Sequence, residues 1–188
     1  MNLTLTNNFY TWMRSVLLQT NTSIGTTTTG VSGHGSGNEK PVGVIKNTDG
    51  VEQTGISIGN NAGRTTSLNS WSSGSTTTEG NTYFEIGSNN VEPTADDYCL
   101  SSYTLGTDYS ATWRAIGNAT MVNDKAQLAF SISVTAINDI AVGEVGMFKY
   151  IRGTGNVPAY FLLGRATFDE PISLASGESV TFQVTIEI

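Results

Sequence analysis

The feature that most constrains this chain is a strict alternation of apolar and polar side chains in its last third. Over residues 179–188 every second side chain is apolar, and Ser, Thr, Gln and Glu occupy the positions between. The same period of two runs over the eight residues 128–135, where Ala, Ser and Thr occupy the positions between. Because a β-strand points successive side chains to opposite faces, the pattern predicts strands with one buried and one exposed face. The apolar positions are Leu128, Phe130, Ile132, Val134, Val180, Phe182, Val184, Ile186 and Ile188.

Further short segments have the composition of strands, and turn-forming residues separate them. They are residues 42–46, 54–58, 82–87, 111–117, 144–151 and 159–168. The helices that the crossovers of a parallel sheet require are not predicted between them. The sequence therefore predicts an all-β fold for residues 40–188, an antiparallel β-sandwich of jelly-roll type with about eight strands.

A short helix is predicted ahead of the sandwich, within residues 1–19. Its apolar side chains recur at spacings of three and four, which places them on one stripe of a helix. The stripe either covers one end of the sheet or docks on a neighbouring subunit, and the sequence leaves both alternatives open. As a docking element it would use Phe9, Trp12, Met13, Val16 and Leu17. Residues 20–39, rich in Gly, Ser and Thr, are predicted to be a linker or a long loop.

The charge balance excludes two classes of partner. Nine Lys and Arg residues stand against sixteen Asp and Glu residues, so the formal net charge is −7. Such an acidic chain lacks the basic surface with which proteins bind nucleic acids or anionic membranes. The first residues also lack the basic and apolar regions of a secretory signal peptide, so we expect assembly in a cytoplasm.

No catalytic motif is present, and we expect no enzyme activity. The lone cysteine, Cys99, rules out an intrachain disulfide and a cysteine-based zinc site. His34 is the lone histidine and lies in the sequence GHGSG, far from Cys99. Oxygen ligands for Ca²⁺ are plentiful, but no spacing of them indicates a site. We therefore predict no catalytic residue, no metal and no cofactor.

Trp71 is the candidate for a different activity. It lies in a Ser/Gly/Thr-rich segment, where an indole ring could stack on the face of a sugar. The alternative is that Trp71 caps the end of the sandwich or anchors a subunit contact.

Three segments resemble small structural proteins of tailed bacteriophages. IGSNNVEPTADDYCLSS (86–102) is similar to a segment in which Pro and Asp-Tyr follow a Gly-containing turn. EVGMFKYIRGTGNVPAYFLLGRATFDEPISLASGESVTFQVTIEI (144–188) looks like their C-terminal half, and TNNFYTWMRSVL (6–17) like their N-terminal helix. Gly164 stands where the family often has Ala. The resemblance implies a virion component, either a capsid decoration (cement) protein or a small tail or fibre protein.

The sequence is therefore compatible with three functions. The first is a non-enzymatic virion structural protein that binds other virion proteins, such as capsid or tail subunits, as a homo-oligomer such as a trimer. It would be assembled in the host cytoplasm and located in the virion. The second is a carbohydrate-binding or host-attachment module that uses Trp71 and takes a host glycan. The third is a hydrolase with two carboxylates about 5–10 Å apart in a cleft.

Overall fold

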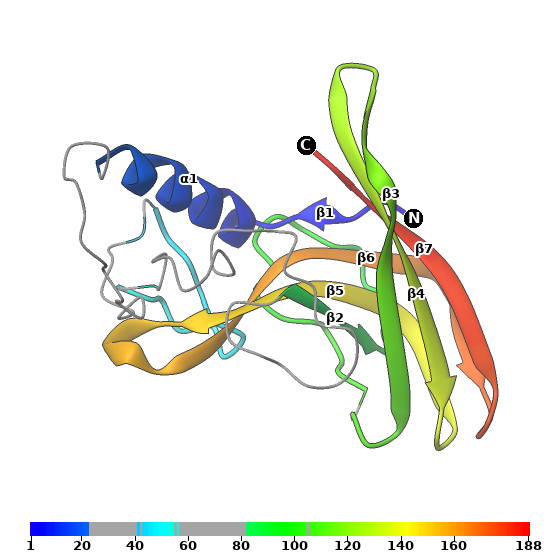
Figure 1. Ribbon diagram of the computed structural model, residues 1–188. Coiled ribbons are helices and arrows are strands. Elements are labelled where there is room, and N and C mark those ends of the chain that lie inside the picture. Colours follow the sequence, from blue (N-terminus) through cyan, green and yellow to red (C-terminus); the bar gives the residue numbers. More distant parts are fainter. Residues whose placement is uncertain (23–40, 42, 55, 57–81, 105) are drawn as a thin grey trace, which may run out of the picture.

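The described residues form two antiparallel β-sheets and one α-helix (Figure 1). The structure is a computed structural model that describes residues 1–22, 41, 43–54, 56, 82–104 and 106–188. Its described elements are β1 (Thr4–Leu5), α1 (Asn7–Thr22), β2 (Thr82–Gly87), β3 (Tyr109–Val122), β4 (Lys125–Ala136), β5 (Ile140–Arg152), β6 (Pro158–Leu174) and β7 (Ser179–Glu187). A short 3₁₀ turn, Thr154–Asn156, joins β5 to β6.

The strand order separates the chain into a four-stranded and a three-stranded sheet. The first has the order β1-β6-β5-β2, and the second has the order β3-β4-β7. Two hairpins, β3–β4 and β5–β6, supply the longest ladders, and every paired strand runs antiparallel to its neighbour. The mostly β, antiparallel character predicted from the alternating pattern is therefore confirmed.

The apolar faces of the two sheets pack against each other. Phe84 on β2 contacts two residues of the other sheet, with ring centroids 5.3 Å from Phe130 and 6.2 Å from Trp113. Phe168 on β6 also packs edge to face against Phe182 on β7, with ring centroids 5.1 Å apart. Because β4 and β7 alternate strictly, their Ser and Thr side chains lie on the opposite, outer face.

Helix α1 covers the other end of the four-stranded sheet. Trp12 is fully buried and packs in a second apolar cluster with Ile151 of β5 and Phe161 of β6. Phe9 is 1% exposed and belongs to the main core. Of the two roles that the sequence left open for the apolar stripe, these two side chains therefore take the covering one. In this conformation they are not available to a neighbouring subunit.

The first five residues join the two sheets. The Leu3 amide donates to the carbonyl of Thr185 on β7, and the Thr185 amide donates to the carbonyl of Met1, both at 2.9 Å. The chain then pairs with β6, where Leu5 lies opposite Gly164. Leu3, Leu5 and Phe9 thus belong to the same apolar core as the two sheets.

The strand predicted at residues 42–46 does not form in the described part of that range, residues 43–46. Their one ladder contact is an isolated bridge between Lys46 and Glu52. The backbone of Lys46 pairs instead with the side chain of Asn8, through N–H to Oδ1 at 2.8 Å and Nδ2 to the carbonyl at 2.7 Å. Thr11 Oγ1 donates to the carbonyl of Val44 at 2.9 Å. Side chains of α1 therefore satisfy the backbone groups that a strand would have used. The segment predicted at 54–58 and the linker at 20–39 lie largely outside the described residues.

Candidate functional site

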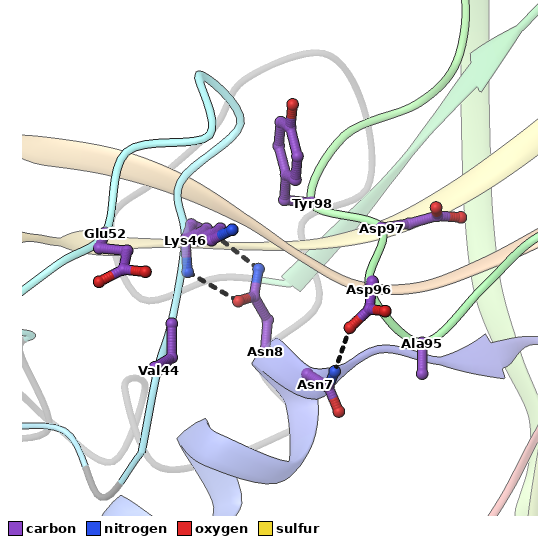
Figure 2. Close-up of a pocket in the computed structure, with 9 residues that line it drawn as sticks. All are labelled: Asn7, Asn8, Val44, Lys46, Glu52, Ala95, Asp96, Asp97 and Tyr98. Carbon is purple, nitrogen blue, oxygen red and sulfur yellow. Dashed lines mark hydrogen bonds between the residues drawn. The ribbon is translucent and has the colours of Figure 1, made fainter.

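A pocket of about 230 Å³ opens where α1 begins, and Figure 2 shows the side chains around it. Three segments that are far apart in the sequence form its walls: the first turn of α1, residues 44–52 and residues 95–98. The lining residues are Asn7, Asn8, Val44, Lys46, Glu52, Ala95, Asp96, Asp97 and Tyr98.

The first turn of α1 holds the other two walls in place. Asn8 fixes the backbone of Lys46 through the two hydrogen bonds described above. Asn7 Nδ2 donates to Asp96 Oδ1 at 2.8 Å (Figure 2). The ammonium of Lys46 lies 5.9 Å from the ring centroid of Tyr98, within reach of a cation–π contact. Hydrogen bonds and a cation–π contact thus connect the three segments that line the pocket.

A buried ionic network lies behind the Asp97 wall. Arg165 of β6 is 2% exposed, and its Nε donates to Glu144 Oε2 at 2.7 Å. Its two terminal nitrogens bind the Asp97 carboxylate and the carbonyl of Val91. Glu144 is fully buried and also accepts from the amides of Ser101 and Ser102, at 3.1 and 2.7 Å. The network anchors residues 91–102 to the four-stranded sheet.

This network bears on the carboxylate-pair hypothesis. Glu85 and Glu144 lie on the same face of β2 and β5, because Glu144 is opposite Gly87 in the ladder. Burial raises the pKa of Glu85, a shift that would suit a general acid. Glu144, however, binds Arg165 and the Ser101–Ser102 backbone and has no exposed surface. In this arrangement the Glu144 carboxylate holds Arg165 and the Ser101–Ser102 backbone in place.

Cys99 lies in the same segment and is half-buried. Burial raises the pKa of its thiol, and the carboxylates of Asp97 and Glu144 raise it further, against a smaller opposite effect of Arg165. An activated thiolate requires a lowered pKa. The surroundings of Cys99 therefore favour the neutral thiol.

One buried cation lies beneath α1. Lys149 of β5 has no exposed surface, its Nζ donates to Thr82 Oγ1 at 3.4 Å, and it lies 5.3 Å from the ring centroid of Trp12. Burial lowers the pKa of Lys149 to about 7. The charge of this side chain therefore changes near neutral pH.

The β3–β4 hairpin projects beyond the sandwich (Figure 1). Asn123 and Asp124 form its tip, with φ angles of 50° and 62° that suit a two-residue turn. Met121, next to last in β3, is 69% exposed, and the last residue of the strand, Val122, is 41% exposed. We call residues 116–126, together with the C-terminal Ile188 that pairs with Ala126, the arm.

The arm continues the apolar inner face of the three-stranded sheet. Along that face, the buried Phe130–Val184 pair is followed by Leu128–Ile186 and then by Ala126, which pairs with Met121 on one side and Ile188 on the other. Ile188 is 54% exposed. The same alternation that builds the core therefore ends on an exposed apolar surface.

The residues predicted from sequence are placed as follows. Phe9 and Trp12 are buried, and Met13 is partly buried against both apolar clusters. Val16 and Leu17 lie within α1, but their side chains are outside the described residues. Trp71 and His34 are outside them as well, so the glycan prediction at Trp71 and the Cys99–His34 pair are not addressed by the structure.

Sequence reasoning missed the arm and the pocket. The signal for the arm was available, because Met121 and Val122 directly precede the turn-forming pair Asn123-Asp124. The pocket had no such signal, since its walls meet only through the tertiary packing of α1.

Comparison with protein-family models, curated proteins and solved structures found no match in any of the three. Among the described helices, none is long and apolar enough to cross a membrane. In the same part of the chain, no three His, Cys, Asp or Glu side chains are grouped in a way that could hold a metal ion.

Proposed function

We propose that this protein is a non-enzymatic structural protein that binds other protein subunits through its arm. The observation that carries the proposal is the exposed apolar face that Met121 of the projecting hairpin forms with Ile188 beside it. Val122 is exposed on the opposite face of the same strand. Apolar side chains that continue a core and then meet solvent mark interaction surfaces. Burying them against a subunit would extend the core by the same packing that builds it.

The resemblance to tailed-phage structural proteins supports a more specific proposal, a capsid decoration protein of the virion. Its partners would be capsid or tail subunits and further copies of itself, as in a trimer, and it would join the particle in the host cytoplasm. The jelly-roll connectivity is part of the same proposal, and an experimental structure that places residues 57–81 tests it.

The docking element proposed here differs from the one expected from the sequence. Phe9 and Trp12 pack within the chain, so removing residues 1–19 would damage the fold before it could reveal docking. Substitutions in the arm avoid this difficulty, because their side chains are exposed.

The experiment compares Met121→Ser/Val122→Ser with the wild type for attachment to phage particles that lack the protein. Cosedimentation measures attachment, and light scattering measures the mass in solution. Val157→Ser is the matched control, because Val157 is 61% exposed at the β5–β6 turn. We expect the arm variant to lose attachment with unchanged thermal stability and the control to retain it. Normal attachment of the arm variant would refute the proposal.

A further inference from the structure

A second surface is found on the outer face of the three-stranded sheet. A hollow of about 370 Å³ lies there, lined by Thr112, Trp113, Arg114, Ser131, Ser133 and Thr181. This volume falls within the range of about 300–1,000 Å³ that is usual for small-molecule sites. The hollow is built on three paired strands, so its walls are held by backbone ladders rather than by loops.

The register places hydroxyl groups in regular rows across this face. Thr112 lies opposite Ser133, which lies opposite Thr181, so one row crosses all three strands. Ser133 and Thr181 share a hydrogen bond of 2.8 Å between their hydroxyl oxygens. The neighbouring row holds Arg114 and Ser131. Neighbouring strands lie about 4.8 Å apart, so donors and acceptors recur at a spacing that a polyhydroxylated ring can meet.

Arg114 is the cation of this hollow. Its side chain is exposed, and no other residue in the described part of the chain forms a hydrogen bond or an ion pair with it. Arg165 shows the contrast, since its guanidinium is saturated by two carboxylates and a carbonyl. A guanidinium presents a planar fork of donors that matches a carboxylate or a sulfate group.

The geometry points to a binding site for an anionic sugar, in which Arg114 pairs with the acid group and the Thr112–Ser133–Thr181 row binds ring hydroxyls. A single guanidinium holds a small inorganic anion weakly, whereas the hydroxyl rows add contacts that only a polyhydroxylated ligand can use. The acid group is a carboxylate or a sulfate, which offer the same chemistry to the fork. The site shares no residue with the arm, so it goes beyond the proposed subunit binding.

The test measures binding of four probes to the full chain by calorimetry. Trigalacturonate and 3′-sialyllactose carry carboxylates, a heparin-derived disaccharide carries sulfates, and lactose is the neutral reference. We expect at least one anionic probe to bind measurably more tightly than lactose. Comparing the affinities of the carboxylate probes with that of the sulfated probe shows which acid group the site prefers. Arg114→Gln should weaken that binding by about tenfold or more.

Two controls make the result specific. Arg14→Gln removes the same charge from an exposed position on α1 and should leave binding unchanged. Ser133→Val keeps Arg114 but removes one hydroxyl of the row. This variant should bind the anionic sugar more weakly, and its melting temperature should change by no more than a few degrees. Failure of all anionic probes to bind, equal binding of lactose, or an Arg114→Gln variant that binds like the wild type would each overturn the inference.

Discussion

Replacing Arg165 by Met removes the guanidinium that neutralises two carboxylates behind the pocket. The methionine side chain fills a similar volume but cannot donate a hydrogen bond. Glu144 then stays fully buried, with the Ser101 and Ser102 groups as its remaining donors. Asp97 keeps its two hydrogen bonds from Thr94, so most of the penalty falls on Glu144.

The expected loss is large, because a buried charge loses its partner. Removing one member of a buried ion pair costs about 3–5 kcal/mol of folding free energy. For a chain of this size, about 2–4 °C of melting temperature is lost per kcal/mol, which gives a decrease of roughly 6–20 °C. Glu144→Gln should lower the free energy of unfolding by less, because Arg165 keeps its hydrogen bonds to Asp97 and to the carbonyl of Val91. The double variant should be less destabilised than the sum of the single variants, since it leaves no unpaired charge at this position.

Urea unfolding followed by tryptophan fluorescence measures these free energies, and hydrogen exchange at the Ser101 and Ser102 amides reports the local effect. Those amides should lose protection in Arg165→Met, because their acceptor is no longer held in place. Arg14→Met, at an exposed site on α1, should change stability by less than about 0.5 kcal/mol. A cost below about 1 kcal/mol for Arg165→Met, or additive single and double variants, would refute the view that the network is desolvated and coupled.

Three further substitutions test separate parts of the fold. The lowered pKa of Lys149 means that the unfolded chain binds one more proton between pH 7 and pH 10, so stability should rise with pH there by about 1 kcal/mol per unit. Lys149→Met should flatten this rise in urea titrations from pH 7 to 9.5, and an unchanged slope would disprove the assignment. Trp12→Ala should lower the free energy of unfolding by about 3–5 kcal/mol in the same assay, as the loss of a buried core side chain does. Replacing an exposed docking residue would change it very little. Gly87→Ala should lower the melting temperature and the protection of Ser102, because a Cβ would lie 2.0 Å from the Ser102 carbonyl oxygen; a variant as stable as the wild type would show that this approach is not tight.

The strands of the second half were predictable because their signal is local. The period of two in residues 127–138 and 179–188 became β4 and β7, and the segments at 82–87, 144–151 and 159–168 became parts of β2, β5 and β6. The helix at the N-terminus was predicted from its spacing and found as α1. In each case a single stretch of chain contains both the residues that favour the element and the periodic spacing that places its apolar side chains on one face.

The fate of residues 43–54 was not predictable in this way. Their valine and isoleucine favour a strand, but Asn8 and Thr11 of α1 bind the backbone that a partner strand would have used. The pocket at the start of α1 depends on the same contacts. Two hydrogen-bonding possibilities compete here, and only the docked helix decides between them.

The sequence by itself therefore determined which side chains share a face, because the periods of strands and helices are properties of the backbone. Tertiary structure alone decided which of those faces became covered. Phe9 and Trp12 met the four-stranded sheet and were buried, while Met121 and Ile188, at the far end of the apolar face of the three-stranded sheet, stayed exposed. Burial depends on what lies opposite a face, and sequence periodicity carries no information about that.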